Sequence, residues 1–138
     1  MTSIRENAGL FFEACETGKG WDGCAQYCRP GATFSAQTAA LAGVMTVEEY
    51  TDWMKGLLAI APDGRAEIRS FGVDDARNSV AIYGIFRGMH TAEGGPVPPT
   101  GKSVEADYVY VLDYEDDKIR HMTKIWNDAI SLQQLGWA

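Results

Sequence analysis

The chain of 138 residues carries little positive charge and has no long apolar run. Its 12 Lys and Arg are outnumbered by 19 Asp and Glu, which gives a net charge of −7. Nucleic acids and anionic membranes bind basic patches, so we expect neither as a partner. No apolar run reaches the ~18 residues of a membrane-spanning helix.

Cysteine is also scarce, and its odd number argues against a disulfide framework. With 3 cysteines, at least one thiol has no internal partner. Residues 1–7 contain no apolar core of a signal peptide. Both features predict a cytoplasmic protein. Cys24 and Cys28 stand four residues apart, which is not the C-x-x-C spacing of redox sites. With Cys15 and two distant histidines they could form a zinc site, but we expect buried free thiols and no metal.

The composition is that of an ordered globular protein. Hydrophobic residues make up 46% of the chain and charged residues 22%. This length predicts one domain over residues 1–138. The irregular stretch at residues 91–101, TAEGGPVPPTG, is rich in glycine and proline and predicts a loop inside that domain.

Helical patterns dominate residues 3–60. Ser3 and Glu6 have the spacing of a capping box, and Thr46 and Glu49 repeat it before a second helix that ends at residues 62–64. A short helix over residues 21–27 and a short strand over residues 33–37 are expected between them. The first helix has an apolar stripe of Ala8, Leu10, Phe11, Phe12 and Cys15. The second has a stripe of Val47, Tyr50, Trp53, Met54, Leu57 and Leu58.

Strand patterns dominate the second half. They cover residues 66–72, 79–91, 104–113 and 118–127, and a last helical turn over residues 129–135 follows, with Asp128 as its N-cap. Helices followed by long strands predict an α+β fold. We expect N-terminal helices packed on a strongly curved antiparallel sheet, with a deep apolar pocket on its concave face.

Two segments carry a resemblance to a known family: FRGMHTAEGGPVPPTGKSVEADYVYV and DDKIRHMTKIWNDAISLQQLGW. With them, the whole chain resembles the nuclear transport factor 2-like superfamily, in its branch of SnoaL-type polyketide cyclases. The resemblance implies a cone-shaped α+β barrel, a homodimer, and small hydrophobic ligands handled without a metal or organic cofactor. It also implies that Lys124 occupies the position of the acid/base Asp of those cyclases, and Tyr110 that of their His.

Strand alternation groups several side chains with Lys124. If Lys124 faces the pocket, Met122, Trp126 and Asp128 lie near the same face, as do Tyr108 and Tyr110 of the neighbouring strand. An apolar site disfavours the charged form of lysine, so Lys124 could act as a base or as a Schiff-base nucleophile. The alternative is an exposed lysine, or one paired with Asp128 or Glu105.

Two further titratable residues admit two interpretations each. His90 could transfer protons or could hold the adjacent loop by hydrogen bonds. Asp107 lies among Val and Tyr, and could be a general base or bridge to Arg87 or Lys124.

Together these features predict a cofactor-independent enzyme. Its acid/base chemistry would be cyclisation, isomerisation, dehydration or hydration of a small hydrophobic oxygenated molecule. The alternative is a non-catalytic ligand-binding protein or dimeric scaffold. We expect a homodimer built on the outer sheet face. The candidate catalytic residues are Lys124, Asp107, His90 and Tyr110. The candidate ligand-binding residues are Tyr27, Trp53, Tyr108, Met122, Trp126 and Asp128.

Overall fold

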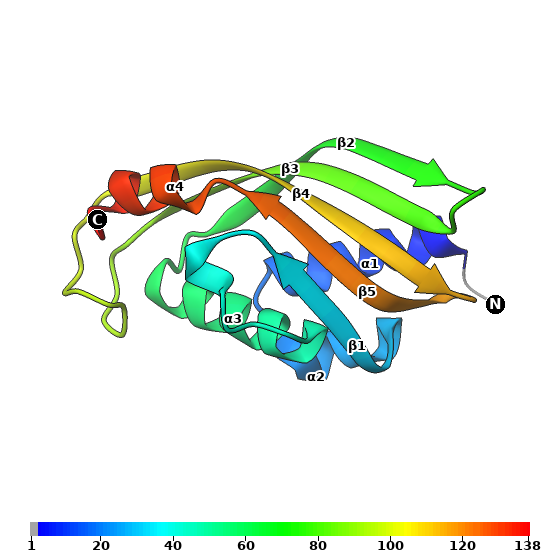
Figure 1. Ribbon diagram of the computed structural model, residues 1–138. Coiled ribbons are helices and arrows are strands. Elements are labelled where there is room, and N and C mark those ends of the chain that lie inside the picture. The colour runs from blue at the N-terminus through cyan, green and yellow to red at the C-terminus, as the bar shows by residue number, and fades with distance from the viewer. Residues whose placement is uncertain (1–2) are drawn as a thin grey trace.

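The computed structural model describes residues 3–138 as helices packed on one five-stranded sheet (Figure 1). The N-terminal part is mainly helical and the C-terminal part mainly strand, which confirms the predicted α+β class. The helices are α1 (Ile4–Glu16), α2 (Gly20–Cys24), η1 (Ala25–Tyr27), η2 (Ala39–Leu41), α3 (Val47–Ile60) and α4 (Asp128–Leu135). The strands are β1 (Cys28–Ala36), β2 (Arg65–Asp74), β3 (Ser79–Met89), β4 (Ser103–Glu115) and β5 (Lys118–Trp126).

The sheet is curved, open and mixed, with strand order β1-β5-β4-β3-β2. Strands β2 to β5 form an antiparallel meander as predicted, but β1 runs parallel to β5. The expectation of a wholly antiparallel sheet is therefore wrong for this pair. Its partners lie far apart in the chain, so no hairpin dictates their direction. Strand β1 also begins at Cys28, well before the predicted residues 33–37.

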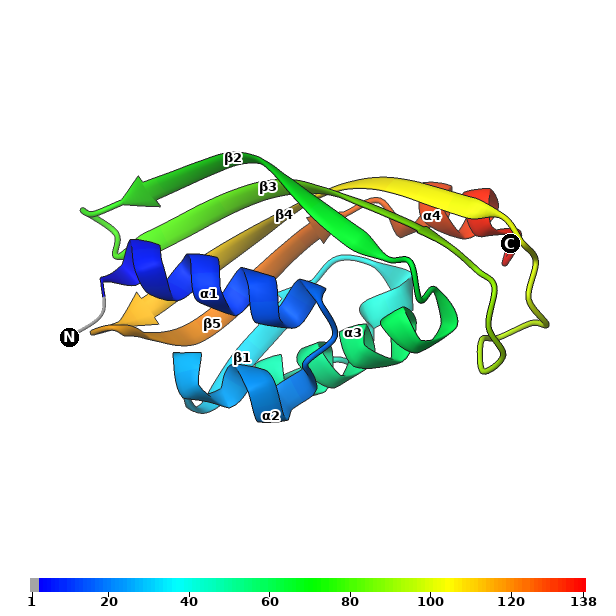
Figure 2. The same ribbon diagram turned by 180° about the vertical axis from the view of Figure 1, so that it is seen from behind.

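The two long helices begin at the predicted caps. Ser3 Oγ accepts a hydrogen bond from Glu6 N (3.1 Å), and Thr46 with Glu49 forms a complete capping box at α3. Helix α1 crosses the concave side of the sheet (Figure 2) and buries Ala8, Phe11, Phe12 and Cys15 there. Leu10, placed in that stripe from the sequence, is 44% exposed, because it falls on the opposite side of the helix turn.

The side chains of β4 point alternately to the two faces of the sheet. Its even-numbered residues from Val104 to Tyr114 are buried against the helices, whereas Asp107 is exposed on the other face. On β5 the same alternation buries Met122 and Lys124 and leaves Ile125 59% exposed. The concave face thus carries a lysine inside an aromatic core.

Helix α4 begins differently from the prediction. Asn127 is its N-cap, and Asp128 Oδ2 instead accepts a hydrogen bond from Ala40 N (2.8 Å), so Asp128 does not cap the helix. At the other end Gly136 adopts φ 75°, a conformation that favours glycine. The turn returns the chain towards the sheet, and Trp137 N donates to Leu132 O (2.8 Å).

Within residues 3–138, no helix combines the length and the apolar character needed to cross a bilayer. Cys15, Cys24 and Cys28 are all buried free thiols, as the sequence predicts.

Candidate active site

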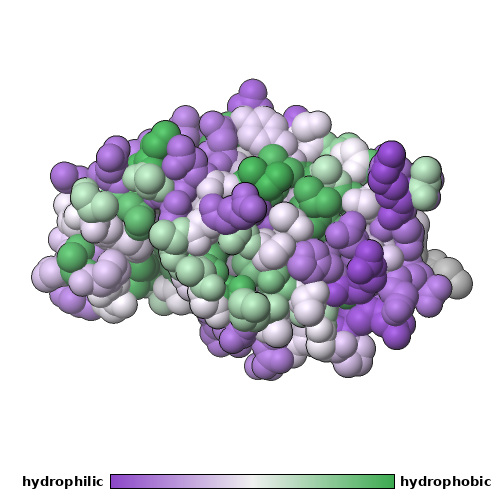
Figure 3. Space-filling model, viewed as in Figure 1, coloured by the Kyte–Doolittle hydropathy of each residue, from purple (hydrophilic) through white to green (hydrophobic). Residues whose placement is uncertain are grey.

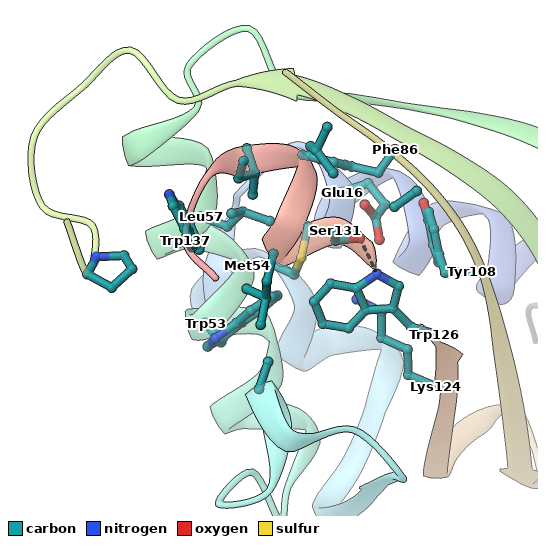
Figure 4. Close-up of a pocket in the computed structure, with 16 residues that line it drawn as sticks. Glu16, Trp53, Met54, Leu57, Phe86, Tyr108, Lys124, Trp126, Ser131 and Trp137 are labelled. Atoms are coloured by element: carbon teal, nitrogen blue, oxygen red, sulfur yellow. Dashed lines mark hydrogen bonds between the residues drawn. The ribbon is translucent and has the colours of Figure 1, made fainter. Parts of the chain in front are cut away.

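A cavity of about 420 Å³ lies between the concave sheet face, α3, α4 and the loop 91–101 (Figure 4). Its wall is mostly apolar and aromatic, with Lys124 and Glu16 as the charged side chains among its lining residues. The lining residues are Glu16, Ala40, Trp53, Met54, Leu57, Phe86, Pro96, Val104, Ala106, Tyr108, Lys124, Trp126, Ser131, Leu132, Leu135 and Trp137. This is the deep apolar pocket that the sequence predicts.

Lys124 projects from β5 into a cluster of aromatic rings and is only 6% exposed. Its Nζ lies 4.3 Å from the centroid of the Trp126 ring, 5.3 Å from that of Tyr108 and 5.4 Å from that of Trp53. Ring faces attract a cation, but they replace few of the hydrogen bonds that water would give it. Tyr110 is the direct cross-strand partner of Lys124.

A chain of hydrogen bonds leads from Lys124 to Glu16 at the end of α1. Lys124 Nζ donates to Tyr50 OH (2.9 Å), and the hydroxyls of Tyr50 and Tyr110 are 2.6 Å apart. Tyr110 OH donates in turn to Glu16 Oε1. Because Tyr110 gives its proton to Glu16, Tyr50 must donate to Tyr110, and all bonds point the same way. The chain can therefore carry a proton from the lysine to the carboxylate.

Burial moves the pKa values of Lys124 and Glu16, the two ends of this chain, towards each other. It lowers the pKa of Lys124 to about 8, although the negative charge of Glu16 acts in the opposite direction. Burial likewise raises the pKa of Glu16, while Lys124 and the hydrogen bond from Tyr110 lower it. A base with a pKa near the working pH is suited to proton transfer.

Tyr108 lies beside the chain on the cavity wall. Its hydroxyl is buried and has no hydrogen-bond partner within residues 3–138. The ring lies over β3 at Gly84, where an added Cβ would be 3.0 Å from the hydroxyl oxygen. Glycine in this strand therefore makes room for Tyr108.

His90 is fully buried at the base of the loop 91–101 and does not line the cavity. Its Nδ1 accepts a hydrogen bond from Trp137 Nε1 (2.9 Å). Its backbone N donates to Lys102 O (3.0 Å), and its backbone O accepts from Gly101 N (2.9 Å). His90 thus holds the loop and the C-terminal Trp137, which are both part of the cavity wall.

The structure brings only some of the other predicted site residues to the cavity. Trp53, Tyr108 and Trp126 line the cavity with Lys124, while Tyr110 lies directly behind it in the hydrogen-bond chain.

The other predicted site residues lie away from the cavity. Asp107 is on the outer sheet face, where its Oδ1 accepts a hydrogen bond from Tyr83 OH (2.7 Å). Asp128 is bonded to η2, Met122 lies in the core, and Tyr27 packs at the start of β1; none of these three lines the cavity.

Two residues of this arrangement, Glu16 and Tyr50, are not among the site residues that the sequence predicts. Glu16 follows Ala8 and Phe12 at intervals of four, so it continues the buried stripe of α1. A carboxylate on an apolar stripe is the signal that could have found it. The helical spacing of Tyr50 predicts a core residue, and spacing cannot show that its hydroxyl reaches Lys124.

The described part of the chain contains no group of three or more His, Cys, Asp or Glu side chains arranged to hold a metal ion. The chemistry available from the cavity's own side chains is that of an amine, tyrosine hydroxyls and one carboxyl group.

Solved structures with the same fold come from several bacteria. IdmH of Streptomyces antibioticus, described as a candidate polyketide cyclase, aligns with a TM-score of 0.77 at 21% identity, over 98% of this chain and 99% of that one. AclR of Streptomyces galilaeus, described as a candidate hydroxylase, aligns with a TM-score of 0.73 at 22% identity, over 99% and 88%. A protein of Catenulispora acidiphila with a ketosteroid isomerase-like fold, solved with trimethylamine, gives 0.71 at 15% identity, over 99% and 96%.

These likenesses show the fold. A comparison with curated proteins found no match. The model of the SnoaL-like polyketide cyclase family matches residues 6–135, which include all helices and strands except the first two residues of α1, and both ends of the hydrogen-bond chain. The resemblance seen in the sequence is thereby confirmed, and the chain belongs to the SnoaL-like polyketide cyclase family.

Proposed function

We propose that the protein is an enzyme that uses its own acid and base groups, without a cofactor, on a small hydrophobic oxygenated molecule. The observation that supports this best is the chain from Lys124 through Tyr50 and Tyr110 to Glu16 at the wall of an apolar cavity. An amine linked in this way can release its proton internally and then accept one from a substrate.

The substrate class follows from the wall of the cavity. Aromatic and aliphatic side chains would bind a hydrophobic ring system, and Lys124 would meet its oxygen-bearing carbon. The ammonium form of Lys124 would stabilise the negative charge that develops on a carbonyl oxygen when a neighbouring carbon loses a proton. Cyclisation, isomerisation, dehydration and hydration can each proceed through such a proton transfer.

The experiment is hydrogen exchange next to a carbonyl, with 2-tetralone as a bicyclic probe. In deuterated buffer at pH 8, proton NMR follows the loss of the α-proton signals. We expect the wild-type protein to accelerate the exchange, and Lys124→Met to lose at least ~100-fold of that acceleration, the usual contribution of a general base. Lys19→Met, the same change at an exposed lysine, is the control. Equal rates for Lys124→Met and wild type would refute the proposed role of Lys124.

The second candidate function is ligand binding without turnover. It is favoured by the position of Asp107 and His90, two expected acid/base groups that do not line the cavity. Native mass spectrometry of the freshly purified protein separates the two candidates when combined with the exchange assay. A retained small molecule that the protein never alters, with no exchange of 2-tetralone, would favour a carrier.

We further propose a cytoplasmic homodimer. The outer sheet face carries the cross-strand pair Val109 and Ile125, and hydrophobic residues gather over β4 and β5 in the middle of this face (Figure 3). The three buried free thiols are suited to a reducing compartment. Native mass spectrometry of wild type and Ile125→Lys tests the dimer. We expect a dimer mass for wild type and a monomer mass for the variant, because the variant places a charge on the outer sheet face. A wild-type monomer would contradict the proposal.

A further inference from the structure

The surroundings of Lys124 suit a nucleophile as well as a base. Within residues 3–138, its Nζ makes one hydrogen bond, to Tyr50 OH, and no direct ion pair. The nearest carboxyl group in the network, that of Glu16, is reached only through two tyrosine hydroxyls. A directly paired lysine is held in the protonated form, in which nitrogen has no lone pair to donate. Here the carboxylate can take the proton without blocking the nitrogen.

We propose that Lys124 forms a covalent imine with the carbonyl carbon of an aldehyde or ketone bound in the cavity. This inference deepens the proposed acid/base function and rests on the same site. The rings of Trp126, Trp53 and Tyr108 lie within 5.4 Å of the nitrogen and leave it on the wall of the cavity. They would hold a flat carbonyl compound against the amine.

The step begins with a proton transfer along the chain. One proton leaves Lys124 Nζ through Tyr50 and Tyr110, and Glu16 becomes a neutral carboxylic acid. The nitrogen lone pair then forms a bond to the carbonyl carbon, and the π electrons of the C=O bond move to oxygen. This gives a tetrahedral carbinolamine in its zwitterionic form.

Loss of water completes the step. The oxygen receives one proton from the attacking nitrogen and one from Glu16, which lines the cavity itself. The C–O bond breaks, water leaves, and the nitrogen forms the C=N bond of an iminium ion. In sum, one ammonium and one carbonyl give one iminium and one water, with Glu16 regenerated as a carboxylate. No oxidant or reductant is consumed.

The acidity of Lys124 supports this step. A pKa of about 8 leaves about a quarter of its amine neutral at pH 7.5, against about one part in a thousand for a lysine of ordinary pKa near 10.4. The other four lysines are exposed or half-buried and serve as internal references: Lys19, Lys55, Lys102 and Lys118.

The test traps the imine. Wild-type protein is incubated at pH 7.5 with 2-naphthaldehyde and sodium cyanoborohydride, which reduces an iminium to a stable secondary amine. Peptide mapping by mass spectrometry then gives the rate of labelling at each lysine. We expect labelling at Lys124 to be at least ~10-fold faster than at any other lysine. This is less than the ratio of the neutral fractions of Lys124 and an ordinary lysine at pH 7.5. Labelling at Lys124 no faster than at Lys19 would overturn the proposal.

This comparison is made within one folded protein, so it does not depend on the folding of a variant. Lys124→Arg is a second test by the same peptide mapping. Arginine keeps the positive charge but forms no such imine, so the label at position 124 should be absent. Exchange of 2-tetralone that needs Lys124, without labelling of Lys124, would reject the imine and leave the general-base function standing. Labelling of Lys124 without any exchange would support the imine and reject the proposed proton transfer.

Discussion

Lys124 on β5 and Glu16 at the end of α1 are joined by two tyrosine hydroxyls rather than by a direct ion pair. The arrangement connects two buried ionisable groups whose pKa values burial moves towards each other. Moving a proton from Lys124 to Glu16 therefore costs less free energy than between the same two groups in water, and Lys124 still lines the cavity.

The rate of 2-tetralone exchange should rise with pH. Lys124 acts as a base only when it is neutral, and its pKa is about 8. The second-order rate constant should therefore increase through pH 8 and reach a plateau above it. Proton NMR between pH 6 and pH 10 measures the profile. A profile that falls over this range would show that the protonated form is the active one.

The titration of Lys124 should also appear in the pH dependence of the free energy of unfolding. The folded pKa of about 8 lies below the 10.5 of a free lysine, so between these values the unfolded chain binds the extra proton. The free energy of unfolding of wild type, minus that of Lys124→Met, should rise by about 3 kcal/mol from pH 8 to pH 10.5. Urea denaturation at several pH values measures it.

The comparison with Lys124→Met is needed because other groups titrate in this range. Burial raises the pKa of Cys15 well above its ordinary value and that of Cys28 to about 12. These thiols stay protonated in the folded state while the unfolded chain ionises, so their contribution falls as pH rises. Both proteins contain them, and the difference cancels them. A difference that does not change with pH would contradict the lowered lysine pKa.

Glu16→Gln should shift the pH profile of exchange to lower pH. The negative charge of Glu16 raises the pKa of Lys124, against the larger effect of burial. An amide keeps the size of the side chain and removes this charge, so the midpoint of the rise should move below pH 8. Glu13→Gln, on an exposed position of the same helix, should leave the midpoint in place. A midpoint that does not move in Glu16→Gln would show that the two groups are not coupled.

Most of the fold could be predicted from the sequence because local residue patterns determine where the helices begin and which side of a strand is buried. The capping residues Ser3 and Thr46 mark the starts of two helices, and alternation in residues 104–113 marks which side of β4 is buried. The direction of β1 relative to β5 could not be predicted, since it depends on how distant segments meet. The ends of strands were missed by a few residues for the same reason.

The candidate site was predicted only in part. Alternation correctly grouped Lys124 with Tyr108 and Tyr110, and the same rule puts Asp107, an odd-numbered neighbour, on the other face. The chain to Glu16 needs side chains from α1, α3, β4 and β5 to meet at one place. No single segment contains that information, so neither spacing nor composition reveals it.

Asp107→Asn should leave the exchange of 2-tetralone within about twofold of wild type. Its carboxylate lies on the outer sheet face and accepts a hydrogen bond from Tyr83, and an amide oxygen can still accept that bond. Proton NMR of the exchange under the wild-type conditions measures the effect, and Lys124→Met run in parallel shows the size of a true loss. A loss in Asp107→Asn comparable to that of Lys124→Met would return Asp107 to the reacting groups.

Trp137→Phe should loosen one end of the cavity. Phenylalanine keeps an aromatic ring but cannot donate the hydrogen bond that Trp137 Nε1 gives to His90 Nδ1 at 2.9 Å. His90 is fully buried and its Nε2 has no partner within residues 3–138, so the variant leaves both ring nitrogens unpaired. We expect a loss of about 1–3 kcal/mol in the free energy of unfolding.

The same substitution should weaken ligand binding, because His90 and Trp137 hold the loop 91–101 and the C-terminal turn against the cavity. Fluorescence titration with 2-tetralone and urea denaturation measure the two effects. Trp21→Phe is the matched control, since the indole N–H of Trp21 makes no hydrogen bond in the described part of the chain and Trp21 does not line the cavity. Equal losses in both variants would show that the hydrogen bond to His90 adds nothing beyond the packing of a tryptophan ring.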